Sequence, residues 1–123
     1  MKNSFSLKYE TISGECDAIA CALNVKVQGD LKSTTVEALQ RDFTTMLASD
    51  NVRLADLSVM ELDLKEAALI DSQGLNLLVS VSRQMKLRKV PMRVRVSLRS
   101  VYLTLLSVGL DRQIEVLFED SAR

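Results

Sequence analysis

Ser72 is the residue whose side chain and setting could carry chemistry, because its hydroxyl directly follows the carboxylate of Asp71. A serine hydroxyl attacks a substrate when a base removes its proton. The chain has no histidine, so Ser-His-Asp and Cys-His catalysis and histidine-based zinc sites are excluded. A hydrolase built on Ser72 would need Lys65 as its base, and nothing in the sequence fixes that geometry. We therefore expect no catalytic residue.

Motifs for nucleotides and metals are absent from the sequence. Neither G-x-x-x-x-G-K nor G-x-G-x-x-G occurs, and these are the glycine-rich patterns that hold nucleotide phosphates. The two cysteines are Cys16 and Cys21, and we interpret both as reduced thiols. We expect neither a cofactor nor a bound metal.

Length and charge narrow the class of protein. A chain of 123 residues with 47% hydrophobic residues is enough for one sizeable core, so we expect a single domain over residues 1–123. Sixteen basic and sixteen acidic residues cancel, so no overall positive field is available to hold the protein on nucleic acid or on an anionic membrane, and direct binding of nucleic acid is disfavoured. No apolar run approaches the roughly 18 residues that cross a bilayer. We expect no membrane insertion and a cytoplasmic location.

Two strands are expected first, joined as a hairpin. An alternating run from Phe5 to Tyr9 is followed by the turn signal Ser13-Gly14 and by a second alternating run over residues 18 to 27. Period-two alternation is typical of strands with one buried face.

Three helices then alternate with three strands. The expected caps are a capping box of Thr34 and Glu37 for a helix over residues 35 to 48, Asp71-Ser72 for the second helix, and Ser97 and Gly109 at the two ends of the third. The expected strands cover residues 57 to 64, 92 to 96 and 114 to 118. Strands separated by helices pair in parallel, so the order ββαβαβαβ predicts an α/β domain with a mixed, mostly parallel sheet and helices packed on it.

The segment from Leu62 to Leu75 resembles the central segment of STAS domains, particularly bacterial anti-sigma factor antagonists. Its Asp-Ser-x-Gly-Leu core at residues 71 to 75 is the marker of that family. The resemblance extends to Gly29-Asp30-Leu31, similar to the turn after the family's second strand. It also covers residues 97 to 110, similar to the family's third helix and the Gly-Leu that follows it. The resemblance implies a STAS fold over nearly the whole chain.

The resemblance also implies a function, that of a switch controlled by phosphorylation of Ser72. In the family, the matching serine accepts phosphate from a serine kinase of histidine-kinase-like fold that is also the anti-sigma factor, and a PP2C-type serine phosphatase removes it. This chain has Gln73 where the family often has Ser or Thr, and Lys32 where the family has a second acidic residue. These two differences leave the identity of the kinase open. The implied partner-binding residues are Asp30, Asp71, Ser72, Gln73 and Gly74. An alternative is a STAS scaffold subunit without switching, for example beside a lipid-transport ATPase.

The position of Ser72 before a helix has a plain interpretation and a sharper one. The plain interpretation is a helix cap, with no other role. The sharper one places Ser72 as the N-cap, where the N–H groups of the first helical turn favour an added phosphate and the fold survives modification. With the family resemblance, we favour the regulatory serine.

Charges are segregated along the sequence. The middle of the chain is acidic, at Asp56, Glu61, Asp63, Glu66 and Asp71. No acid then occurs before Asp111, while the intervening segment has seven cations, at Arg83, Lys86, Arg88, Lys89, Arg93, Arg95 and Arg99. We interpret both groups as solvated faces. The alternative is that the acidic side guides a basic partner.

Overall fold

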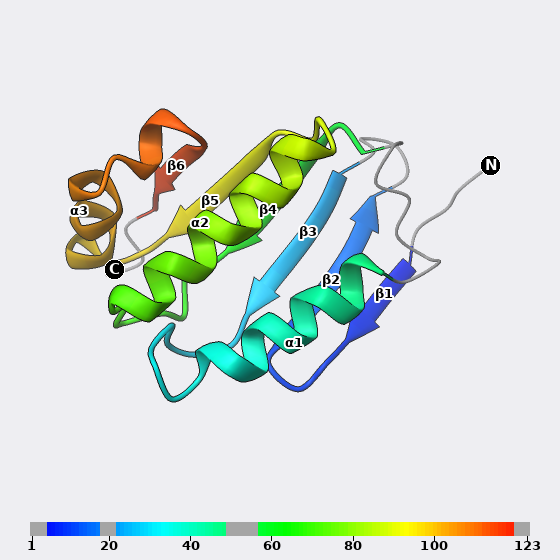
Figure 1. Cartoon of the computed structure of the whole chain (residues 1–123), viewed down its shortest axis with the longest axis horizontal. Coiled ribbons are helices and arrows are strands. Elements are labelled where there is room, and N and C mark those ends of the chain that lie inside the picture. Colours follow the sequence, from blue (N-terminus) through cyan, green and yellow to red (C-terminus); the bar gives the residue numbers. More distant parts are fainter. Residues whose placement is uncertain (1–4, 18–21, 49–56, 120–123) are drawn as a thin grey trace.

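The computed structural model describes residues 5–17, 22–48 and 57–119, and its six strands form one sheet in the order β1-β2-β3-β4-β5-β6 (Figure 1). The strands are β1 (Phe5–Lys8), β2 (Ile12–Asp17), β3 (Ala22–Val27), β4 (Val59–Asp63), β5 (Met92–Val96) and β6 (Glu115–Phe118). The helices are α1 (Val36–Leu47), α2 (Ser72–Leu87), α3 (Arg99–Ser107) and the short 3-10 helix η2 (Leu110–Arg112).

The sheet changes from antiparallel to parallel pairing at β3. β1, β2 and β3 pair antiparallel, whereas β4, β5 and β6 add in parallel, each after a helix. Parallel neighbours have their carboxyl ends at the same edge, so the loops after β3 and β4 meet there. α2 begins at that edge (Figure 1). The expected α/β class with a mixed, mostly parallel sheet is confirmed.

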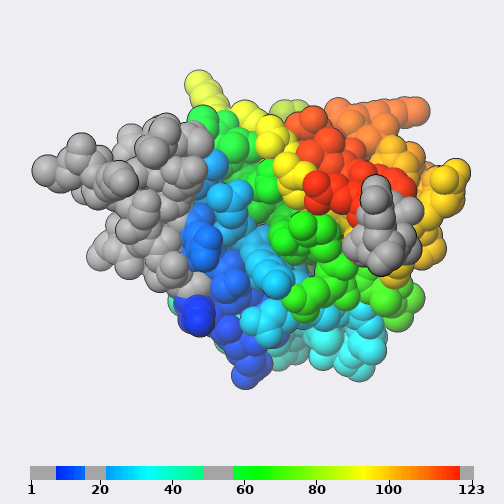
Figure 2. All heavy atoms as spheres, turned by 180° about the vertical axis from the view of Figure 1, so that it is seen from behind, coloured from blue at the N-terminus to red at the C-terminus, as the bar shows by residue number. Residues whose placement is uncertain are grey.

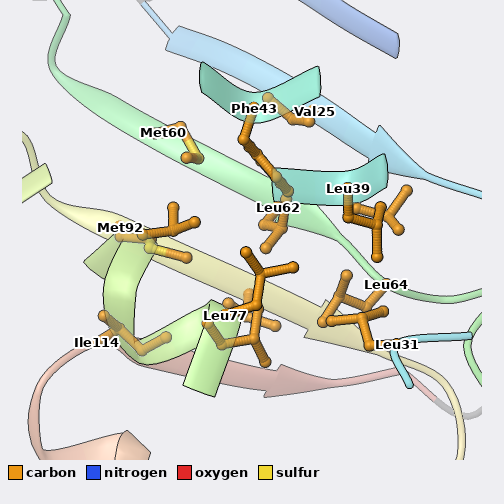
Figure 3. Packing of buried hydrophobic residues seen from close by; sticks show 14 of the residues in the cluster. Val25, Leu31, Leu39, Phe43, Met60, Leu62, Leu64, Leu77, Met92 and Ile114 are labelled. Atoms are coloured by element: carbon orange, nitrogen blue, oxygen red, sulfur yellow. The ribbon is translucent and has the colours of Figure 1, made fainter. Parts of the chain in front are cut away.

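The core lies between the sheet and its helices. Alternate residues of β3, β4 and β5 are buried, as the period-two patterns predict. The helices bury one stripe each, formed in α1 by Leu39, Asp42, Phe43 and Met46 and in α2 by Gly74, Leu77, Leu78, Val81, Ser82 and Met85. Figure 3 shows Phe43 and Leu77 directed toward strand residues such as Leu62, with Leu31 of a loop in the same cluster. Full burial of each large apolar side chain contributes roughly 1.5–3 kcal/mol.

The N-terminal region has three strands where two were expected. Ser13 and Gly14 are no turn: they lie inside β2 and pair with Lys26 and Val25. Gly14 is buried beneath α1, and a Cβ there would lie 2.9 Å from the sulfur of Met46. Glycine serves a close approach of two elements here, which a sequence pattern does not separate from a turn. Residues 18–21, including Cys21 and the start of the expected second run, lie outside the described residues.

The expected capping box of the first helix is wrong. Thr35, and not Thr34, is the N-cap of α1, and the Thr35 side chain makes no capping hydrogen bond to the helix. The Thr35 hydroxyl instead donates to the backbone carbonyl of Asp30 at 2.8 Å and accepts from the backbone N–H of Lys32 at 3.1 Å. It therefore stabilises the turn that follows β3.

The third helix also begins differently from the prediction. Leu98 is its N-cap, and the hydroxyl of Ser97 donates to the backbone carbonyl of Lys65 at 2.6 Å. Ser97 therefore ties the end of β5 to the loop that leads into α2. At the other end of α3 the prediction is confirmed, because Gly109 is left-handed with φ 75°.

The sheet face that α1 and α2 leave uncovered is turned toward the viewer in Figure 2. Acidic and basic side chains of β4, β5 and β6 form ion pairs with one another on this face. Glu61 pairs with Arg93 at 3.1 Å and with Arg95 at 2.7 Å. Arg93 also pairs with Glu115 at 3.0 Å, and Arg95 with Glu119 at 2.7 Å. Burial opposes ionisation of Glu61, but the hydrogen bonds and charges of Arg95 and Arg93 lower its pKa. Two of the seven cations of the basic stretch are thus neutralised by glutamates.

Candidate functional site

Ser72 is the first residue of α2 and is exposed. Its expected position as the N-cap is wrong, because Asp71 occupies that place with extended backbone (φ −97°, ψ −173°). The Asp71 side chain can bend back to the helix, whereas Ser72 already has helical backbone. Among the described residues, none forms a hydrogen bond with the Ser72 hydroxyl. A free, solvated hydroxyl is the form that a modifying enzyme requires.

The carboxylate of Asp71 fixes the start of α2 from two sides. One oxygen accepts from the backbone N–H of Gly74 at 3.0 Å, and the other accepts from the backbone N–H of Ser33 at 2.9 Å. These two hydrogen bonds lower the pKa of Asp71, so the carboxylate stays ionised at neutral pH. The N–H of Gly74, one of the first-turn donors expected to favour a phosphate, is therefore already bonded to a carboxylate beside Ser72.

Asp30 fixes the loop that precedes α2. Its carboxylate accepts from the backbone N–H groups of Ala68 at 2.7 Å and Leu69 at 3.1 Å. Asp30 follows Gly29, which has a left-handed backbone with φ 81°. The conformation of the chain after β3 therefore directs the Asp30 carboxylate toward the loop before Ser72.

Leu31 joins the same two segments through its backbone. Its N–H donates to the carbonyl of Leu69 at 3.0 Å, and its carbonyl accepts from the N–H of Asp71 at 3.0 Å. Leu31 and Ile70 form a parallel bridge, so the pairing of β3 with β4 resumes beyond the ends of the strands. Both side chains belong to the core. The backbone immediately before Ser72 is therefore held by the core.

Gly74 is buried against Leu31. A Cβ at this position would lie 2.8 Å from the Cβ of Leu31 and closer still to its carbonyl oxygen, so only glycine fits without movement. Gly74 was expected to contact a partner, but its burial gives it the role of positioning α2. Gln73 is exposed beside Ser72, as a partner contact requires.

Lys65 is engaged elsewhere. Its ammonium pairs with the carboxylate of Glu119 at 3.4 Å, and in the described part of the chain no hydrogen bond joins it to Ser72. The sequence's one candidate base therefore has a different partner. Within the same residues no cluster of three or more Cys, Asp or Glu side chains could hold a metal, and no helix is long and apolar enough to span a membrane.

The structure brings together the sequence-predicted residues Asp30, Asp71, Ser72, Gln73 and Gly74 at one edge of the sheet. Sequence reasoning missed Leu31, Ser33, Ala68 and Leu69, which hold the site together. Each of them contributes backbone groups to hydrogen bonds. Because every residue except proline has a backbone N–H, the residue type does not reveal which of them are used in this way. The Gly29-Asp30 pair after a strand was the one sequence signal that pointed to the turn containing Leu31 and Ser33.

Comparisons with known proteins agree with this fold. The family model of the STAS domain matches residues 15–122. None of the curated proteins matches the chain by sequence.

Solved structures share the fold at low identity. A Thermotoga maritima protein, solved as a candidate anti-sigma factor antagonist, has a TM-score of 0.67 and 14% identity over 83% of this chain and 82% of its own. An anti-sigma factor antagonist from Mycobacterium paratuberculosis has a TM-score of 0.65 and 14% identity, over 95% and 86% of the two chains. The phosphorylated form of the Bacillus cell fate determinant SpoIIAA has a TM-score of 0.58 and 10% identity, over 96% and 92%. Since the family model covers most of the chain and these structures share its architecture, the protein belongs to the STAS domain family.

Proposed function

We propose that this protein is a partner-switching regulator of the anti-sigma factor antagonist kind, controlled by phosphorylation of Ser72. The observation that carries the proposal is an exposed, unbonded serine hydroxyl on a rigid helix start, directly beside the ionised carboxylate of Asp71. The protein acts through binding and not as an enzyme. We further propose that residues 1–123 work as one domain in the cytoplasm.

The unphosphorylated surface around Ser72 is the binding surface in this proposal. Ser72 and Gln73 face the partner with Asp71 at their side, while Asp30 and Gly74 hold the two loops in place. The partner is a serine kinase of histidine-kinase-like fold that is also the anti-sigma factor. A PP2C-type serine phosphatase restores the bare hydroxyl.

A phosphate on Ser72 would release the bound partner through repulsion between negative charges. It adds close to two negative charges next to Asp71, whose carboxylate already occupies the helix N-terminus. The first-turn amide of Gly74 is therefore not free to neutralise the new charge. Like charges brought together in a partly desolvated contact cost several kcal/mol, which lowers affinity by orders of magnitude. Because the core and the loop hydrogen bonds do not use the Ser72 hydroxyl, the fold should persist.

The first experiment is phosphosite mapping on protein isolated from its own cells. We expect the intact mass to include one phosphate that phosphatase treatment removes, and peptide mapping to place it on Ser72. Ser72→Ala should abolish the added mass. Ser100→Ala is the matched control, because Ser100 is also exposed in the first turn of a helix, α3.

A binding experiment then separates the switch from the scaffold. Complexes retained by the parent protein should be lost with Ser72→Glu and kept with Ser100→Glu, which adds the same charge elsewhere. An absence of phosphate on Ser72 in growing and stressed cells, with a stable transporter ATPase complex that tolerates Ser72→Glu, would overturn the switch and support the non-switching scaffold.

A further inference from the structure

The structure divides the basic stretch of the sequence into two groups. Arg93 and Arg95 are paired with glutamates on the sheet face that α1 and α2 do not cover, which we call the open face. Four other cations surround the C-terminal end of α2, and within residues 5–17, 22–48 and 57–119 none of the four forms an ion pair: Arg83, Lys86, Arg88 and Lys89. We call these four residues, with Leu87 among them, the basic tip of α2.

The basic tip combines unneutralised charge with an exposed apolar side chain. All four cations are exposed, and Leu87 is 82% exposed, the largest value among the exposed large hydrophobic residues of the described chain. Arg83, Lys86 and Leu87 lie on one side of α2, opposite the buried Met85, because positions three and four apart share a helix face. The dipole of a helix favours cations near its C-terminus, but it gives no reason for a leucine to be exposed among them.

We propose that the basic tip of α2 docks on an anionic lipid bilayer. Cations attract the negative headgroups, and an exposed leucine between them inserts into the interface, as in the surface-bound basic helices that read as membrane contacts. The chain's zero net charge gives no sign of this patch, because a net charge sums all residues and does not show where cations gather.

The shape of the basic tip favours a membrane over other anionic partners. Figure 1 shows it at the far end of α2 from Ser72, at the margin of the molecule, and Figure 2 shows the yellow-green end of α2 projecting there. A projecting leucine enters a bilayer interface without a matching pocket, whereas an acidic protein would need one. Nucleic-acid phosphates offer Leu87 no apolar contact, and the tip has no aromatic side chain for stacking on bases.

Membrane docking leaves the Ser72 surface free. α2 has 16 residues, which separates its two ends by about 24 Å at 1.5 Å per residue. A protein held at the membrane by one end of α2 could therefore bind a partner at the other. The docking proposal does not rest on phosphorylation of Ser72 and is tested without it.

The experiment is flotation of the purified full chain with vesicles. We expect binding to vesicles of phosphatidylcholine with phosphatidylglycerol, little binding to phosphatidylcholine alone, and weakening by salt. Arg83→Gln with Lys86→Gln should lower the partition coefficient roughly 25-fold, at about fivefold for each cation. Leu87→Ser should lower it several-fold and leave the salt dependence unchanged.

The matched control is Lys8→Gln with Arg99→Gln, which removes two exposed cations at the opposite edge of the fold. It should retain at least half of the parent's binding. Equal losses in the two double variants, or equal binding to both vesicle types, would overturn the proposal. So would binding to a DNA duplex or a polyglutamate peptide without binding to vesicles, because the tip would then recognise another partner. Thermal unfolding of each variant identifies any loss caused by misfolding.

Discussion

Asp30 and Asp71 each bind the segment that carries the other. The carboxylate of Asp30 accepts from the amides of Ala68 and Leu69, just before Asp71, and the carboxylate of Asp71 accepts from the amide of Ser33, just after Asp30. Charge-assisted hydrogen bonds of this kind are stronger than neutral ones. The two loops around Ser72 are therefore one mechanical unit, although the residues are far apart in sequence.

Asp30→Ala should loosen the loop before Ser72. Hydrogen exchange at the amides of Ala68 and Leu69 should quicken at least tenfold, and the free energy of unfolding should fall by about 1–2 kcal/mol, because both amides lose a charged acceptor. Mass spectrometry of the exchanged protein measures the first effect and urea unfolding the second. Asp30→Asn retains an acceptor oxygen, so its exchange rate and stability should lie between those of the parent protein and those of Asp30→Ala. Parent-like exchange in Asp30→Ala would show that Asp30 does not hold this loop.

Gly74→Ala should displace the start of α2. A Cβ at this position overlaps the backbone of Leu31, and overpacking of this kind costs about 1–3 kcal/mol. Urea unfolding should show that loss, and any phosphorylation of Ser72 should slow because the acceptor has moved. Asn76→Ala is the control, an exposed position of the same helix where alanine should change stability by less than about 0.5 kcal/mol. A Gly74→Ala protein as stable as the parent would contradict the close contact.

Acid should unfold the protein through carboxylates whose pKa is lowered in the fold. Burial opposes ionisation of Asp42, but hydrogen bonds from the Thr11 hydroxyl and N–H, at 2.7 and 2.8 Å, and the charge of Arg41 lower its pKa. Glu61 and Asp71 are lowered as well. A lowered pKa stabilises the fold above the unfolded-state value, about 3.9 for Asp and 4.3 for Glu, and that contribution is lost as pH falls through the folded value.

The free energy of unfolding should therefore fall below about pH 4.5, as measured by urea titrations at successive pH values. Asp42→Asn should be less stable than the parent at pH 7, and the difference should shrink in acid because the parent's carboxylate is then neutral too. A difference that is constant from pH 7 to about pH 3 would show that ionised Asp42 contributes no stability.

Glu61→Gln should weaken the open face of the sheet. Glu61 joins Arg93 and Arg95, and its side chain is only 19% exposed. Without its charge two neighbouring arginines lose a shared partner, so we expect a loss of about 1–2 kcal/mol in urea unfolding at low salt. Glu66→Gln is the control, since Glu66 pairs with Lys26 at the surface and such pairs contribute roughly 0–1 kcal/mol. Equal losses in the two variants would contradict a network centred on Glu61.

Most of the helices and parallel strands were predictable because their signals are local. Alternation in β4 and β5, helical spacing in α1 and α2, and the left-handed Gly109 all follow from one segment at a time. The wrong predictions concern residue types that have both a local role, in a turn or a cap, and a role in contacts between distant segments. Gly14 suggested a turn but admits Met46 inside a strand, and Ser97 suggested a cap but bonds to Lys65 in another loop.

The sequence by itself determined the α/β class, the order of its helices and parallel strands, and the Asp71-Ser72 pair before a helix, because side-chain periodicity and capping preference act over a few residues. Only the tertiary structure decided that Asp71 is the cap, that the Ser72 hydroxyl has no hydrogen-bond partner in the described part of the chain, and that Asp30 and Leu31 hold the loop before it. It also decided that Arg93 and Arg95 form ion pairs, whereas the cations of the basic tip form none with the residues that the structure describes. These outcomes depend on backbone amides and charges that meet through the parallel order of β3, β4 and β5, and such long-range contacts have no signature in a local pattern.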